Sequence, residues 1–88
     1  MLNKSLFACR VCGLEQPEPP WGLDGKTATF DICACCGAEF GYEDSLYSAV
    51  VSYREEWKRK GMNWWSEKDK PEDWDVKAQL SNIPAEYL

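Results

Sequence analysis

The chain has 88 residues, enough for one small domain, and its fifteen acidic residues outnumber its ten basic residues to give a formal net charge of -5. This charge argues against a nucleic-acid partner, because proteins that bind DNA or RNA gather Lys and Arg on one face to neutralise phosphates. The sequence contains no histidine, which removes the commonest general base and every zinc site that mixes Cys with His. No apolar stretch approaches the length that spans a bilayer, so we expect no membrane segment.

Two cysteine pairs dominate the first half of the chain. Each pair encloses two residues and is followed directly by glycine, and twenty residues separate the two pairs. This spacing is typical of a four-thiolate metal site, in which two tight turns point their sulfurs at one ion. The predicted metal ligands are Cys9, Cys12, Cys33 and Cys36.

The segment around and between the pairs is predicted to form the rest of a zinc ribbon. A short strand is expected over residues 6–9, where the chain enters the first pair. After a proline-rich loop, the dipeptide Asp24-Gly25 indicates a tight turn, and residues 27–33 alternate as a second strand would. Residues 1–43 are therefore expected to form two metal-binding turns and a short β-hairpin.

A shell of four cysteines indicates a structural metal, because a catalytic zinc keeps one coordination position open. We therefore expect a non-enzymatic protein that binds Zn2+, with iron as the alternative ion for the same thiolates. Disulfides fit less well, because five cysteines would leave one over. The amino terminus also lacks the apolar run of a signal peptide, so the expected location is the reducing cytoplasm.

The fifth cysteine, Cys35, lies between two predicted ligands and leaves three interpretations open. It could be a redox-sensitive thiol whose oxidation ejects the metal, or it could replace Cys33 or Cys36 as a ligand. The third interpretation is an inert thiol packed beside the site, as free cysteines commonly are.

Residues 44–88 are predicted to form two helices, which completes a small metal-stapled α+β domain over residues 1–88. The first helix is expected to begin with an N-cap at Asp44 or Ser45, to run through Lys60 and to end at Gly61. Its apolar stripe is expected to face the core, and its charged residues, Arg54 among them, are expected to face outward.

The second predicted helix is shorter. Pro71 followed by two acidic residues is a typical start of a helix, and Trp74, Ala78 and Leu80 would give it an apolar face. Pro84 lies beyond its expected end.

Tryptophans are unusually frequent for so short a chain. They could fill the space between the helices and the ribbon, because aromatic side chains dominate small cores. They could equally form an exposed patch for a protein partner, because tryptophan is enriched at interface hot spots. The residues considered for such a surface are Trp21, Trp64, Trp65 and Trp74.

The paired motifs resemble those of rubredoxin and of zinc ribbons over about the first forty residues. Residues 32–44 join the second pair to acidic and aromatic side chains, and together with the first pair they look like the small bacterial cysteine-rich proteins of the CPCC type. The first pair encloses Arg10 and Val11, where the name of that family expects Pro-Cys. The resemblance implies a small bacterial metal-binding protein, and only the four cysteines of the pairs carry over as ligands.

These features favour a small scaffold, held by zinc, that presents helices and tryptophans to another protein. The alternative is an electron-transfer protein with a single iron in the same four thiolates, as the resemblance to rubredoxin implies.

Overall fold

A computed structural model describes residues 4–88 of the chain. Residues 1–3, which belong to the segment considered above for a signal peptide, lie outside the described residues. Two α-helices and three short 3-10 helices follow one another along the chain. They are η1 (Lys4–Phe7), α1 (Tyr47–Arg59), η2 (Glu67–Asp69), α2 (Val76–Leu80) and η3 (Ala85–Tyr87).

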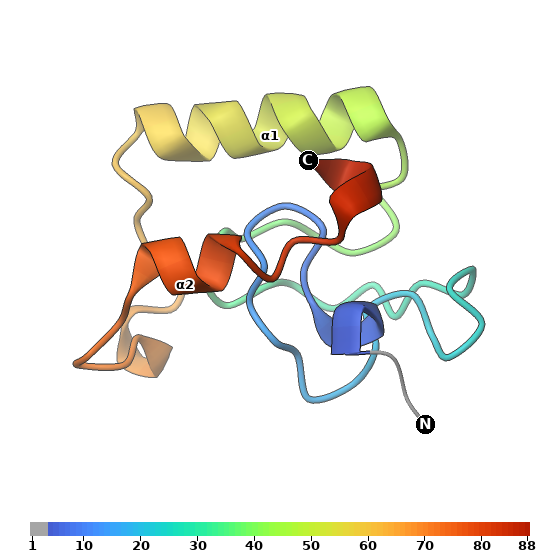
Figure 1. Ribbon diagram of the computed structural model, residues 1–88, viewed down its shortest axis with the longest axis horizontal. Helices are drawn as coiled ribbons and strands as arrows, with labels where there is room; N and C mark the ends of the chain where they lie inside the picture. Colours follow the sequence, from blue (N-terminus) through green and yellow to red (C-terminus); the bar gives the residue numbers. More distant parts are fainter. Residues whose placement is uncertain (1–3) are drawn as a thin grey trace.

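The loops of the first half and the helices of the second half pack against each other. Figure 1 shows α1 along one edge of the molecule and the loops on the opposite side, with the chain returning through α2 to η3 beside α1. The core between them is built around sulfur, since all five cysteines are buried. The apolar residues that complete this buried cluster are Val11, Ala38, Phe40, Val50, Trp57 and Trp64.

The predicted zinc ribbon with a β-hairpin is wrong, because residues 4–88 form no strand or sheet. The expected first strand is replaced by η1 and by one isolated bridge between Ala8 and Glu15. The expected second strand contributes only the bridge between Ile32 and Glu39. Its backbone is interrupted at Phe30, whose φ angle of 64° is not that of an extended chain.

The hydrogen bonds of residues 27–33 explain this outcome. The N–H groups of Thr27 and Thr29 donate to the carbonyls of Trp21 and Pro20, while the carbonyl of Asp31 accepts from a residue beyond the second cysteine pair. The two ends of the segment thus pair with different parts of the chain. A continuous ladder of backbone hydrogen bonds cannot form under these conditions.

Helix α1 begins later than predicted. Its N-cap is Leu46, and no side chain caps the helix. The predicted caps are engaged elsewhere: the carboxylate of Asp44 accepts from the Gly41 N–H at 2.7 Å, and Ser45 Oγ donates to the Gly41 carbonyl at 2.8 Å. The predicted end is confirmed, because Gly61 follows the C-cap with a φ angle of 104°.

The start predicted for the second helix at Pro71 is wrong. Asp75 is the N-cap of α2, and its carboxylate accepts hydrogen bonds from the N–H groups of Lys77 and Ala78 at 3.1 and 3.2 Å. A side chain that satisfies two free N–H groups of the first turn fixes the start of a helix more strongly than a preceding proline does.

No helix within residues 4–88 combines the length and the apolar character that crossing a bilayer requires.

Candidate metal centre

Both cysteine pairs lie in loops with the same backbone hydrogen bonds. In the first loop the Cys9 N–H donates to the carbonyl of Leu14, and the Gly13 N–H donates to the carbonyl of Cys9, both at 2.9 Å. The same two bonds recur at the same length in residues 33–38, twenty-four positions later. Gly13 adopts a φ angle of 84°, which a residue with a Cβ atom adopts only with strain. The repeated Cys-x-x-Cys-Gly sequence thus encodes a repeated local structure.

The two loops bring the four predicted ligands together. Cys9 Sγ lies 3.7 Å from Cys36 Sγ, and Cys12 Sγ lies 3.6 Å from Cys33 Sγ. All four sulfurs lie within 4.8 Å of one another, and all four residues are buried. Zinc held at about 2.3 Å by four thiolates would place neighbouring sulfurs about 3.8 Å apart. This group of four cysteines could therefore hold one metal ion.

The protonation of the thiols also points to a cation. Hydrogen bonding to Cys33 raises the pKa of Cys12 well above its usual range, and the neighbouring cysteine thiols and burial raise it further. The reciprocal hydrogen bond from Cys12 lowers the pKa of Cys33. The hydrogen bond thus favours a protonated Cys12 beside an ionised Cys33. Four thiolates can coexist in so small a buried volume only when a cation compensates their charge.

Cys35 lies outside this group of four, although it is fully buried beside it. Its sulfur accepts a hydrogen bond from Gln79 Nε2 at 3.3 Å. A redox role, an exchange with a neighbouring ligand and an inert packing role all remain predictions for this residue.

Arg54 is a buried part of the site that the sequence analysis placed on the outer face of α1. Only 5% of the residue is exposed. Its guanidinium donates to the carbonyl of Val11 at 2.7 Å and to that of Arg10 at 2.9 Å, and it also bonds the carbonyl of Tyr87. Arg54 follows the buried Val50 by four residues, so its position on the apolar stripe was the available signal.

Gln79 of α2 is a second residue that the sequence analysis missed. Its side-chain amide donates to the carbonyl of Cys12 at 3.2 Å and to the sulfur of Cys35, while its oxygen accepts from Trp74 Nε1 at 2.8 Å. The backbone of Gln79 also lies close to the first cysteine loop, since a Cβ atom at Gly13 would lie 2.1 Å from the Gln79 carbonyl oxygen. Helix α2 therefore packs directly on the first cysteine loop.

Two relatives match most of the chain. The uncharacterized protein YozI of Bacillus subtilis (strain 168) is 31% identical over 84 residues, which covers 77% of this chain and 69% of the relative. The uncharacterized protein YoaQ of the same strain is 30% identical over 82 residues, covering 76% of this chain and 70% of the relative. The chain belongs to their family. The expected kinship with uncharacterised bacterial proteins is thereby confirmed.

No family model matches the chain, and no solved structure matches it. The resemblance to proteins of the CPCC type and to rubredoxin therefore stays at the level of the cysteine motifs.

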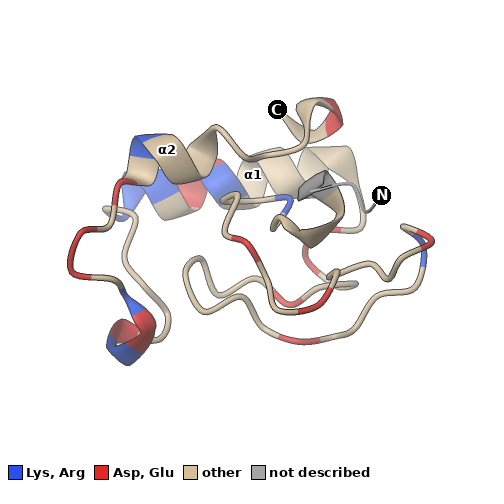
Figure 2. Cartoon of the chain, turned by 60° about the horizontal axis from the view of Figure 1, so that its bottom comes forward, with Lys and Arg blue, Asp and Glu red and all other residues tan. Residues whose placement is uncertain are grey.

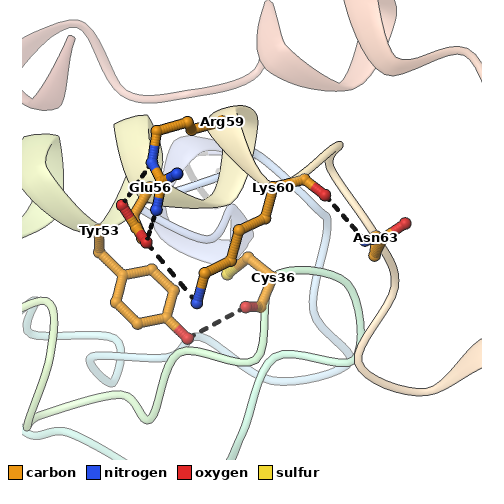
Figure 3. A network of polar contacts seen from close by, with 6 residues as sticks. All are labelled: Cys36, Tyr53, Glu56, Arg59, Lys60 and Asn63. Carbon is orange, nitrogen blue, oxygen red and sulfur yellow. Dashed lines mark hydrogen bonds and ion pairs between the residues drawn. The ribbon is translucent and has the colours of Figure 1, made fainter.

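In this member of the YozI and YoaQ family, a side chain of α1 holds the second cysteine loop. Tyr53 Oη donates to the carbonyl of Cys36 at 3.1 Å, as Figure 3 shows. Burial raises the pKa of Tyr53 to about 12, and the charges of Glu43 and of the cysteine thiolates add to this shift. In the same network Glu56 pairs with both Arg59 and Lys60.

The four tryptophans considered for a partner surface differ in how exposed they are. Trp64 is buried, and its ring meets the edge of the half-buried Trp74 at 82° with 5.5 Å between the centroids. Trp21 is half-buried and donates its Nε1 proton to Asp44 Oδ2 at 2.9 Å. Trp65 is the member of this set that is largely exposed, at 63%.

Proposed function

We propose that the chain is a non-enzymatic zinc-binding protein whose Cys9, Cys12, Cys33 and Cys36 site stabilises a scaffold for binding another protein. The observation that carries this proposal is the group of four buried sulfurs at the centre of the core. Four protein ligands close the coordination shell of zinc, which leaves no position for a substrate or a reactive water.

The packing of the second half supports a structural role for the metal. Arg54, Tyr53 and Gln79 all donate to backbone carbonyls of the cysteine loops. These carbonyls are in the right place only when the loops have their folded shape. Binding a structural zinc ion contributes about 10 kcal/mol or more in small domains, so the metal would stabilise the helices as well as the loops.

The composition favours a protein partner over a polyanion, because fifteen acidic residues outnumber ten basic ones. Reduced thiols are required for the site, which is why we place the protein in the cytoplasm. The resemblance to proteins of the CPCC type is consistent with a small metal-binding protein of this kind.

Metal analysis tests the proposal. Protein purified without added metal should be colourless and should contain one zinc ion per chain, and chelation should abolish its near-ultraviolet circular dichroism and its thermal transition. A protein that stays folded after complete removal of the metal would contradict the structural role.

The rubredoxin-like alternative makes a different prediction in the same experiment. Four thiolates also suit a single iron ion, which would colour the protein and undergo reversible oxidation and reduction. An iron-loaded, redox-active protein would replace the zinc scaffold by an electron carrier.

A further inference from the structure

An open groove of about 940 Å³ runs along the second cysteine loop. Three apolar side chains line it and are substantially exposed: Phe30 at 64%, Ile32 at 43% and Trp65 at 63%. Exposed apolar side chains that share one groove, rather than being scattered singly, are typical of a surface that is covered by a partner.

The two exposed aromatic rings of this groove, Phe30 and Trp65, lie close against glycines. A Cβ atom at Gly37 would lie 2.9 Å from Trp65 Cδ1, and one at Gly41 would lie 2.8 Å from Phe30 Cε1. Each exposed ring therefore lies too close to the glycine backbone to leave room for a Cβ atom. Phe30 also adopts a φ angle of 64°, a strained conformation for an aromatic residue. Rings that are fixed before binding lose little conformational entropy when a partner arrives.

The charges around the groove have one sign. Three carboxylates line it, those of Glu18, Asp31 and Asp69, and among residues 6–88 its lining includes no Lys or Arg. Asp69 accepts a hydrogen bond from Ser66 Oγ at 2.8 Å, and none of the three carboxylates forms an ion pair with a side chain of residues 6–88. The neighbouring Lys70 lies over the ring of Trp74, which is not part of the groove.

This acidic character extends beyond the groove. Residues 13–46 contain seven acidic residues and one lysine. Figure 2 shows the acidic positions spread along these loops, whereas seven of the ten basic residues lie within residues 54–77, on or between α1, η2 and α2. The field over the loops therefore attracts cations and repels nucleic acids and anionic lipids.

We propose that this groove binds a basic segment of another protein, in which arginine or lysine alternates with bulky apolar side chains. The apolar side chains would cover Phe30, Ile32 and Trp65, and the basic ones would pair with the three carboxylates. Arginine fits best, because its planar guanidinium stacks on aromatic rings and pairs with carboxylates in the same pose. The inference rests on the proposed function and names the chemistry of its partner.

Residues that line the groove, or that lie next to it in the chain, form hydrogen bonds to the second cysteine loop. The N–H of Trp65 donates to the carbonyl of Cys35, and that of Ser66 donates to the carbonyl of Ala34, both at 2.9 Å. On the other side, Gln16 Nε2 lies 3.5 Å from Cys33 Sγ. The shape of the groove therefore depends on the cysteine loop.

Calorimetric titration with a synthetic peptide tests the proposal. The probe is a capped six-residue peptide that alternates arginine with leucine, and its control replaces each arginine by glutamate. The intact chain should bind the basic peptide at one site and should not bind the acidic one. Raising the salt concentration should weaken the binding, because exposed charges are screened.

Matched variants locate the site. The triple variant E18Q/D31N/D69N should weaken binding about tenfold or more, because it removes every rim charge. The control E55Q/E72Q/D73N changes the net charge equally at exposed positions outside the groove and should change the affinity less than about twofold. Trp65→Ala should abolish binding, whereas Tyr42→Ala, which removes an exposed aromatic ring outside the groove, should not.

Equal weakening by the two triple variants would overturn the proposal, since it would show attraction to net charge alone. A dimer that Trp65→Ala dissociates in sedimentation equilibrium would also overturn it, in favour of a second copy of this chain as the occupant. Metal content and the thermal transition are measured on the same samples. If a folded, zinc-loaded protein fails to bind the basic peptide, the result contradicts the proposed peptide site alone. If the purified protein contains no metal, the result contradicts the proposed function.

Discussion

The two cysteine loops share one backbone structure and differ in what covers them. The first loop lies under the helices, where Arg54 and Gln79 donate to its carbonyls and where the Gln79 carbonyl approaches Gly13. The second loop is covered more lightly, by Tyr53 and by the exposed ring of Trp65. The repeated cysteine motif thus has two structural roles: one copy packs against the helices, and the other borders an open groove.

The largest expected effect comes from removing one of the four sulfurs that the two loops bring together. Cys33→Ser removes a predicted ligand and should cause loss of the metal and unfolding of both halves, because binding energy in such sites is folding energy. Cys35→Ser is the matched control, since this sulfur lies outside the group of four. Its variant should keep one metal ion per chain and a cooperative thermal transition. Metal loss in the Cys35 variant would instead identify that residue as a ligand.

Arg54 should distinguish the first loop from the second. Arg54→Met leaves the carbonyls of Val11 and Arg10 without their donor, and it should lower the free energy of unfolding by about 3 kcal/mol. Tyr53→Phe removes one neutral hydrogen bond to the second loop and should cost about 1 kcal/mol. Denaturant titrations at a fixed free zinc concentration measure both values. Equal losses would contradict the view that the first loop is the anchor.

Alanine substitutions of the glycines that follow the two cysteine pairs compare the packing around the two loops. Gly13→Ala and Gly37→Ala carry similar backbone strain, since their φ angles are 84° and 80°. The new methyl group at Gly13 would meet a backbone oxygen at 2.1 Å, whereas at Gly37 it would meet the side chain of Trp65 at 2.9 Å. The ring of Trp65 can be displaced at the expense of the groove alone, whereas the Gln79 backbone cannot give way without displacing α2. We expect Gly13→Ala to be more destabilising by about 1–2 kcal/mol in thermal denaturation.

The smallest expected effect is the pH dependence of the stability that Tyr53 contributes at the second loop. The pKa of Tyr53 is raised to about 12, so the folded chain holds this proton more tightly than the unfolded chain, whose tyrosine has a pKa of about 10. The stability that Tyr53 contributes is complete below pH 10 and is lost as the pH rises from about 10 to about 12. Subtracting the ultraviolet titration of Tyr53→Phe from that of the unaltered protein isolates this midpoint. A midpoint near 10 would show that the hydroxyl is solvated.

The sequence predicted the four-cysteine group correctly because its information is local. Two residues between cysteines and a glycine after them are sufficient to set the shape of each loop. The same reasoning placed Gly61 at the end of α1, where a left-handed glycine is required.

The strands, the start of α1 and the partners of Arg54 could not be obtained in this way, because each depends on contacts elsewhere in the chain. The start of α2 is different, since its cap at Asp75 is local and was missed. Asp44 looks like a helix cap in sequence, yet its carboxylate accepts from Trp21 Nε1, twenty-three residues away. Arg54 looks like a surface charge, but its acceptors are backbone carbonyls of the first loop. Backbone carbonyls are present at every position, so nothing in the sequence marks these as acceptors.

The four-cysteine group also bears on the order in which the chain folds. Its members lie within residues 9–36, so the complete donor set precedes the first residue of α1 in the chain and is synthesised before it. A metal ion bound at this stage would close a short segment at little entropic cost. Arg54 and Gln79 would then meet carbonyls that are already in position, and the helices would pack on a preformed template.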